Sequence, residues 1–158
     1  MRFYIHTKLG AIYFILLNLI IPTIAVADEV EIIMTEASSG GLYIHTELGA
    51  AIETDMLLDT GSSYTTLSQL TFDKVNEQSK LSFSRNIYGA MADGRVNQVP
   101  LYILDELVLA DNCILKNIEV AVLQYGDIDI LGLNALKLLQ PFSIQLMPAK
   151  LSINNCAS

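Results

Sequence analysis

The stretch that most constrains this chain runs from Met56 to Leu67 and reads Met-Leu-Leu-Asp-Thr-Gly-Ser-Ser-Tyr-Thr-Thr-Leu. Apolar residues lead into Asp59, a small polar run follows, and apolar residues return after it. This pattern predicts a buried strand that ends in a tight turn. Such a turn would hold the Asp59 carboxylate within reach of backbone N–H groups, and Gly61 lets the backbone bend without a clashing Cβ. An ordinary Asp-Thr-Gly turn between two strands has the same pattern, so the rest of the chain must decide.

The first 27 residues have the pattern of a secretory leader. Arg2 and Lys8 make a basic start, and an almost unbroken apolar run extends from Leu9 to Ala27, where it closes on Ala-Val-Ala. This arrangement predicts a signal peptide over residues 1–27 that is cleaved before Asp28, leaving one domain over residues 28–158. A run of this length can also just span a bilayer, so a retained membrane anchor is the second interpretation.

The charge of the chain argues against two kinds of partner. Without residues 1–27 the chain keeps seven basic and seventeen acidic residues, a net charge of −10 against −8 for the whole sequence. Nucleic acids and anionic membranes are bound through basic patches. We therefore expect no nucleic-acid partner, and a membrane contact only if the leader is retained.

Two cysteines, Cys113 and Cys156, follow the leader. In an oxidising compartment this even number predicts one disulfide that ties the end of the chain back to the domain, and two unpaired thiols are the alternative. The cysteines and His45, the one histidine beyond the leader, lack the spacing of metal ligands, so no metal site is expected. We expect His45 to be a surface or packing residue on a strand.

The rest of the chain predicts a mostly β domain with two short helices. One helix is expected over residues 68–78 with Ser68 as its N-cap, and another over residues 133–139, where Pro141 stops it. Short β-rich runs bounded by turn residues predict strands at 29–34, 42–48, 51–58, 81–88, 96–109, 113–123, 142–147 and 150–153. A frayed lead-in is the alternative for the first of these runs. The second and third of these strands form a hairpin that delivers Asp59.

Three features, taken in order along the chain, resemble one known family. They are Leu57-Leu58-Asp59-Thr60-Gly61-Ser62, a hairpin whose tip lies near Ala92-Asp93-Gly94, and Ile130-Leu131-Gly132 followed by a helix. Together they resemble the retropepsin-like aspartic proteases, the bacterial single-domain relatives of retroviral protease and of pepsin. The resemblance implies an all-β, retropepsin-like acid-protease barrel with a flap hairpin and one or two short helices. Ala92, Asp93 and Gly94 would belong to the flap that covers the substrate.

The resemblance also implies a chemistry that two carboxylates perform together. They share one proton and hold a water molecule, so that one takes a proton from the water while the other donates to the substrate carbonyl. Only one Asp-Thr-Gly occurs in the sequence, so Asp59 from each of two chains would meet in a homodimer. Thr60 would bond to the partner loop. Ser62 would donate to Asp59 and favour its ionised form, which predicts a more acidic optimum than that of the retroviral enzymes.

Two positions depart from the retroviral pattern. The Asp that those enzymes carry shortly after the catalytic motif is replaced here by Tyr64 and Thr65, and the Arg after the second glycine is replaced by Leu133. Both halves of an ion pair that supports the retroviral dimer are therefore missing, which predicts a different dimer contact.

These observations favour an exported aspartic endopeptidase, a hydrolase that acts on protein or peptide substrates without a cofactor. The leader and the resemblance together place it in the bacterial periplasm. A non-catalytic peptide-binding module with the same fold is the alternative, because a monomer would hold only half of an active site. A purely structural, disulfide-stapled domain of the cell envelope is a third possibility.

Overall fold

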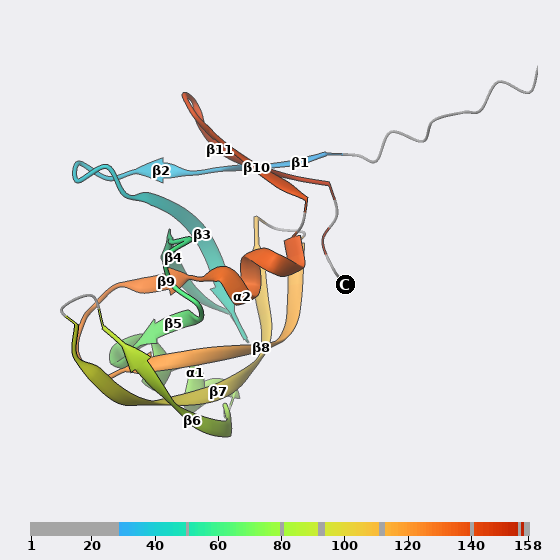
Figure 1. The fold of residues 1–158 in the computed structure, drawn as a ribbon. Coiled ribbons are helices and arrows are strands. Elements are labelled where there is room, and N and C mark those ends of the chain that lie inside the picture. Colours follow the sequence, from blue (N-terminus) through green and yellow to red (C-terminus); the bar gives the residue numbers. More distant parts are fainter. Residues whose placement is uncertain are drawn as a thin grey trace, which may run out of the picture.

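A computed structural model describes residues 29–49, 51–79, 81–91, 94–110, 113–139, 141–154 and 156 (Figure 1). The expected leader over residues 1–27 lies outside the described residues, and so do Ala92 and Asp93 of the expected flap tip. Within the described part of the chain, no helix combines the length and the apolar character that a membrane span requires.

The described elements are mostly strands. The strands are β1 (Val30–Ile33), β2 (Thr35–Glu36), β3 (Leu42–Leu48), β4 (Ile52–Leu58), β5 (Thr65–Ser68), β6 (Ser82–Ala90), β7 (Val96–Leu109), β8 (Cys113–Leu123), β9 (Asp129–Leu131), β10 (Phe142–Leu146) and β11 (Ala149–Ile153). The helices are α1 (Gln69–Ser79) and α2 (Leu133–Leu136), and a 3-10 turn η1 (Lys137–Leu139) continues α2.

Six strands close into a barrel. The large sheet has the order β2-β3-β4-β9-β5-β8-β7-β6. A further pairing of β3 with β7 closes the barrel, which consists of β3, β4, β9, β5, β8 and β7. Most pairings are antiparallel, but β9 runs parallel to β4 and β5 runs parallel to β8. The predicted all-β barrel fold is therefore confirmed, including the β3–β4 and β6–β7 hairpins.

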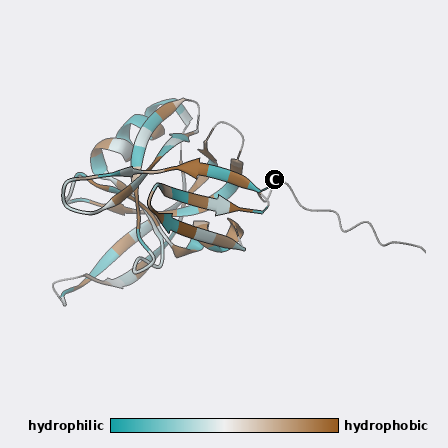
Figure 2. Ribbon diagram, turned by 90° about the horizontal axis from the view of Figure 1, so that it is seen from above, coloured by the Kyte–Doolittle hydropathy of each residue, from teal (hydrophilic) through white to brown (hydrophobic). Residues whose placement is uncertain are grey.

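Alternation along the strands creates the core of the barrel. In β3, Ile44 and Leu48 are fully buried while His45 between them is exposed, as the two-residue period of a strand requires. Figure 2 shows the same alternation as brown and teal bands along the strands. Each such Leu or Ile that leaves water stabilises the fold by about 1.5–3 kcal/mol.

The helices begin where the sequence predicts. Ser68 caps α1, because the Thr71 backbone N–H donates to the Ser68 Oγ at 3.2 Å. The predicted second helix is confirmed as α2 followed by η1, and it ends before Pro141.

A separate three-stranded sheet lies above the barrel in Figure 1, with the strand order β1-β11-β10. Ile32 of β1 and Leu151 and Ile153 of β11 are buried in the same apolar cluster as the barrel residues. This shared core holds the three-stranded sheet against the barrel, although none of its described strands pairs with a strand of the barrel.

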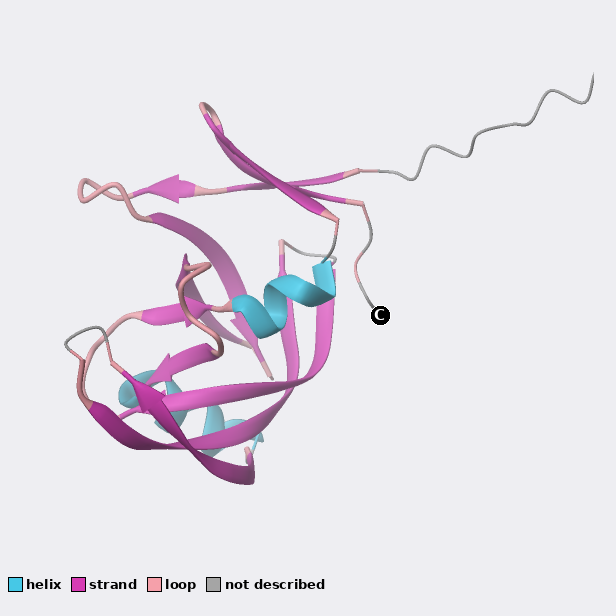
Figure 3. Ribbon diagram, viewed as in Figure 1, coloured by secondary structure: helices cyan, strands magenta, loops and turns pink. Residues whose placement is uncertain are grey.

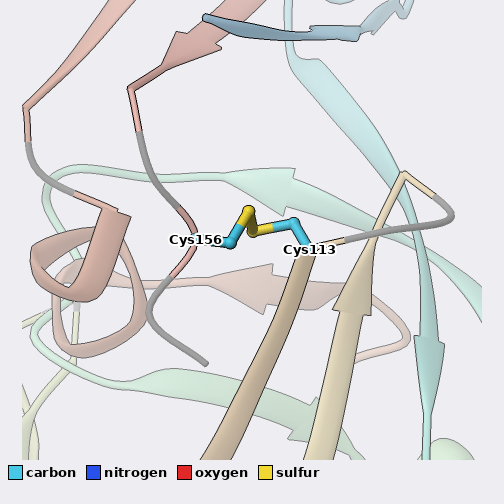
Figure 4. Close-up of a disulfide and its surroundings, with 2 residues drawn as sticks. All are labelled: Cys113 and Cys156. Carbon is cyan, nitrogen blue, oxygen red and sulfur yellow. A yellow bond between two sulfur atoms is a disulfide. The ribbon is translucent and has the colours of Figure 1, made fainter. Parts of the chain in front are cut away.

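The predicted disulfide between Cys113 and Cys156 is confirmed. Its Cα atoms lie 5.2 Å apart, and the bond joins the first residue of β8 to the segment that follows β11 (Figure 4). Neither cysteine is free, and Cys113 is fully buried in the core.

Candidate active site

Asp59 stands directly after β4, where a parallel partner strand fixes the backbone. Leu57 and Leu58 pair with Ile130 and Leu131 of β9, and the Asp59 backbone N–H donates to the Leu131 carbonyl at 3.2 Å. Figure 3 shows the loop that follows β4 passing close to the start of α2 before it enters β5. The pairing of β4 with β9 therefore fixes the half-buried Asp59 at the start of this loop.

The loop from Asp59 to Tyr64 folds back on the carboxylate, and it is called the catalytic loop from here on because of the role that the sequence predicts for it. The Gly61 N–H donates to Asp59 Oδ1 at 2.8 Å, and the Ser62 N–H donates to the Asp59 carbonyl at 3.3 Å. Thr60 and Gly61 are exposed at the tip of this turn. The N–H of Gly61 therefore holds the Asp59 carboxylate in place.

The predicted role of Ser62 is wrong in one respect. Its hydroxyl donates to the carbonyl of Tyr64 at 2.8 Å, and it is therefore not available to donate to Asp59. A hydroxyl has a single proton to donate, and here the loop's own backbone uses it to complete a turn. The acidic optimum argued from Ser62 accordingly loses its structural basis.

Helix α2 supports the catalytic loop from behind. The backbone N–H groups of Leu133 and Asn134 donate to the carbonyls of Ser62 and Ser63 at 2.8 and 3.2 Å. The Asn134 side-chain oxygen accepts from both the N–H and the hydroxyl of Thr65, at 2.7 and 2.9 Å. The loop is therefore bonded to the helix along its second half.

Gly132 makes this contact possible. A Cβ at this position would lie 2.3 Å from the carbonyl oxygen of Tyr64, a distance that no side chain can occupy. The glycine of the Ile-Leu-Gly motif is thus required by the close approach of the catalytic loop to the start of α2.

Asp129 is a second carboxylate near the site, and it is buried. It accepts three hydrogen bonds, from the hydroxyls of Thr54 and Thr71 and from the Ser68 N–H, each at 2.7 Å. Asp129 was not singled out in the sequence analysis. An acidic residue between apolar neighbours in a short strand is the signal that could have indicated a buried, fully bonded carboxylate.

The hairpin that the sequence predicts as the flap is formed by β6 and β7, and it is called the flap from here on. Its tip is closed by hydrogen bonds from the Met91 N–H to the Arg95 carbonyl at 2.7 Å and from the Gly94 N–H to the Met91 carbonyl at 2.9 Å. Gly94 has a φ of +82°, a conformation that favours glycine. Beneath the flap lies a small apolar cluster, formed by buried Val99, Leu101 and Ala121 together with half-buried Tyr64, Ile87, Met91 and Leu123.

An ion pair that sequence reasoning missed lies at the base of this flap. Arg85 of β6 donates through both terminal nitrogens to the carboxylate of Glu119 in β8, and one of these nitrogens also donates to the Tyr64 hydroxyl at 3.3 Å. The bond to Glu119 first, and then the bond to Tyr64, raise the pKa of the Arg85 guanidinium above its ordinary value. No local motif marks these residues.

The described residues contain no group of three or more His, Cys, Asp or Glu side chains suited to a metal ion. His45 lies on the exposed face of β3, where its Nδ1 meets the Asp55 carboxylate at 2.9 Å. The arrangement around Asp59 is a carboxylate held on a hydrogen-bonded turn, which suits acid–base chemistry.

Comparison with known proteins agrees with this geometry. Residues 46–138, more than half of the chain, match the sequence family described as "gag-polyprotein putative aspartyl protease". Among solved structures, the fold is similar to the crystal structure of a retropepsin-like aspartic protease from Rickettsia conorii, with a TM-score of 0.58 and 24% sequence identity over 80% of this chain and 91% of that chain. Curated protein sequences gave no match. The chain therefore belongs to the retropepsin-like aspartyl protease family.

Proposed function

We propose that this protein is an exported aspartic endopeptidase that works as a homodimer. The observation that carries the proposal is the braced Asp59 turn, which holds one carboxylate by a 2.8 Å bond from Gly61 at the end of a strand fixed by β9. Only one Asp-Thr-Gly is present in the chain, so a second copy must supply the second carboxylate.

In the dimer the two Asp59 carboxylates would lie side by side and share one proton, because two adjacent carboxyl groups cannot both ionise. The ionised carboxylate takes a proton from the water held between the pair, and that water attacks the peptide carbonyl carbon. The protonated carboxylate donates its proton to the carbonyl oxygen, which gives a neutral tetrahedral diol. Collapse of the diol, with a proton passed to the nitrogen, breaks the C–N bond. No cofactor takes part in these steps.

The substrate would be an extended peptide that lies between the catalytic loop and the flap. Strands β6 and β7 offer backbone groups for strand addition, and the apolar cluster beneath them offers an apolar wall for side chains. Closure of the flap would exclude water from the reacting bond.

The three-stranded sheet supports the proposal of a second subunit. Strand β10 is an edge strand of this sheet, and apolar Leu146 and Met147 in its hairpin are 65% and 89% exposed. An edge strand that carries exposed apolar side chains pairs readily with another chain, which suits it to contact a second copy. Export to the periplasm is proposed on the leader-like pattern of residues 1–27, a basic start and an apolar run that closes on Ala-Val-Ala.

The test is cleavage of a mixed peptide library by the protein expressed with its leader, from acid to neutral pH and over a range of protein concentrations. We expect activity that an Asp59→Asn variant abolishes and that rises more steeply than linearly with concentration when the protein is dilute. Inhibition by a peptide mimic of the tetrahedral intermediate would support the same conclusion. A folded dimer that is silent at every pH but binds peptides would instead identify a peptide-binding module.

A further inference from the structure

We propose that Tyr64, Arg85 and Glu119, together called the flap link, position the flap strand β6 against the catalytic loop and thereby set the affinity for the peptide. The inference rests on the proposed function, because it assigns these residues a role in that site. It is carried by a continuous set of contacts that joins β6, β8, the catalytic loop and α2.

The first part of the link runs across the sheet. Arg85 pairs in register with Leu101 of β7, and Glu119 of β8 pairs with Ile103 of the same strand. Arg85 therefore reaches over β7 to bind Glu119, where its second nitrogen lies 2.8 Å from Oε2. Ser84 adds a hydroxyl bond of 2.9 Å to Oε1 of the same carboxylate. A two-point contact between a guanidinium and a carboxylate fixes orientation as well as distance.

The second part of the link runs from the flap strand to the catalytic loop. Arg85 donates to the Tyr64 hydroxyl at 3.3 Å, and the Tyr64 ring packs on the apolar cluster beneath the flap. The carbonyl of Tyr64 accepts from the hydroxyls of Ser62 and Thr66, at 2.8 and 3.2 Å. The ring and hydroxyl of Tyr64 therefore contact the flap, whereas its backbone carbonyl is bonded within the catalytic loop and to β5.

The third part of the link connects the flap to α2 through Glu119. Its side chain binds the flap strand, whereas its backbone carbonyl accepts from the Asn134 amide at 2.6 Å. Asn134 in turn accepts from the N–H and hydroxyl of Thr65, just after the catalytic loop. Glu119 is therefore bonded both to the flap and to the helix that supports Asp59.

The solvent exposure of Arg85 and Glu119 limits what their ion pair contributes to the stability of the fold. The side chains of Arg85 and Glu119 are 50% and 24% exposed, so solvent screens their attraction and the pair adds little to the stability of the whole domain. Its contacts nevertheless join elements that are far apart in the sequence, namely β6, β8 and the catalytic loop. The expected contribution of the link is therefore to the position of the flap rather than to folding.

Two variants test the link, Tyr64→Phe, which removes only the hydroxyl, and Glu119→Gln, which removes the charge at nearly constant volume. We expect each to raise KM about threefold to tenfold while kcat changes by less than about twofold, because a looser flap weakens binding before it weakens chemistry. The double variant should lose less than the product of the two single effects, since both variants disrupt the same contacts.

The matched control is His45→Gln, which breaks another exposed cross-strand ion pair, with Asp55, on β3 and β4. Its KM and kcat should equal those of the unaltered protein. Hydrogen exchange of the β6 amides supplies a readout that needs no activity. Exchange there should accelerate severalfold in Tyr64→Phe and Glu119→Gln, and not in the control.

The outcomes separate the two proposals. If exchange in β6 and KM are unchanged in both variants, the flap link has no positioning role, even in an active enzyme. If no protein cleaves any peptide but β6 exchange accelerates as expected, the link stands and the proposed function fails. Multiplicative effects in the double variant would show that Tyr64 and Glu119 act separately, which would also overturn the inference.

Discussion

At the scale of single residues, the catalytic loop is shaped by backbone bonds more than by its hydroxyls. Gly61 supplies the N–H that holds Asp59, while Gly132 supplies the space in which the carbonyl of Tyr64 lies. Ser62 completes the turn by bonding to that same carbonyl. The shape of this loop therefore depends on the two glycines as well as on the acid.

This arrangement predicts the behaviour of Ser62→Ala. The variant should leave the pH–rate profile in place and lower the free energy of unfolding by about 1 kcal/mol, the usual value of one side-chain hydrogen bond. The measurements are kcat/KM against pH and urea denaturation. Ser63→Ala is the control, because Ser63 is exposed and contributes its carbonyl, not its hydroxyl, to the contact with Asn134. Movement of the acid limb in Ser62→Ala by more than about half a pH unit would show that Ser62 acts on Asp59.

At the scale of elements, Asp129 joins β9 to β4 through Thr54 and to the start of α1 through Ser68 and Thr71. Each of its three partners is a donor, and a carboxylate is the side chain that can accept from all of them. The parallel pairing of β4 with β9, which places Asp59, is thus reinforced by one buried acid.

Asp129→Asn should therefore destabilise the fold strongly. The amide would turn an NH₂ group toward donors, and we expect a loss of about 2–4 kcal/mol in the free energy of unfolding, measured by urea denaturation at fixed protein concentration. Asp127→Asn, at an exposed position two residues earlier, should change it by less than about 0.5 kcal/mol. Equal denaturation midpoints for the two variants would contradict this role of Asp129.

The sequence predicts the local elements well and the long-range contacts poorly. Alternation and turn residues were enough for the β3–β4 hairpin, the flap strands and α1, because each depends on neighbours in the chain. The parallel pairings of β4 with β9 and of β5 with β8 depend on barrel closure, for which no short pattern exists. The same reason hid the flap link, since Arg85 and Glu119 are 34 positions apart. The bond of Ser62 to Tyr64 could not be predicted, because a hydroxyl chooses between acceptors only in three dimensions.

At the scale of the whole molecule, one covalent bond joins the barrel to the end of the chain. The disulfide links Cys113 to Cys156 across 43 positions of sequence, a span that includes β8, β9, α2 and the last hairpin. Cross-linking a loop of this length restricts the unfolded chain, and the chain-entropy model assigns it about 4 kcal/mol.

Cys156→Ala removes the bond and leaves Cys113 in its place in the core. We expect the free energy of unfolding to fall by about 2–4 kcal/mol at fixed protein concentration. The unaltered protein treated with a dithiol reductant should fall to the same value, which controls for the loss of the Cys156 side chain itself. Equal stability of the oxidised and reduced proteins would show that the bond does not support the fold.

The position of Cys156 after β11 also determines which truncated chains can form the disulfide. The bond can form only after β11 has been synthesised, because its second sulfur follows that strand in the sequence. A chain that stops between β9 and residue 156 has every strand of the barrel but lacks the second cysteine of the disulfide. The cross-link thus distinguishes chains that reach this residue from truncated ones, and proteolysis in an oxidising compartment would remove the unlocked chains first.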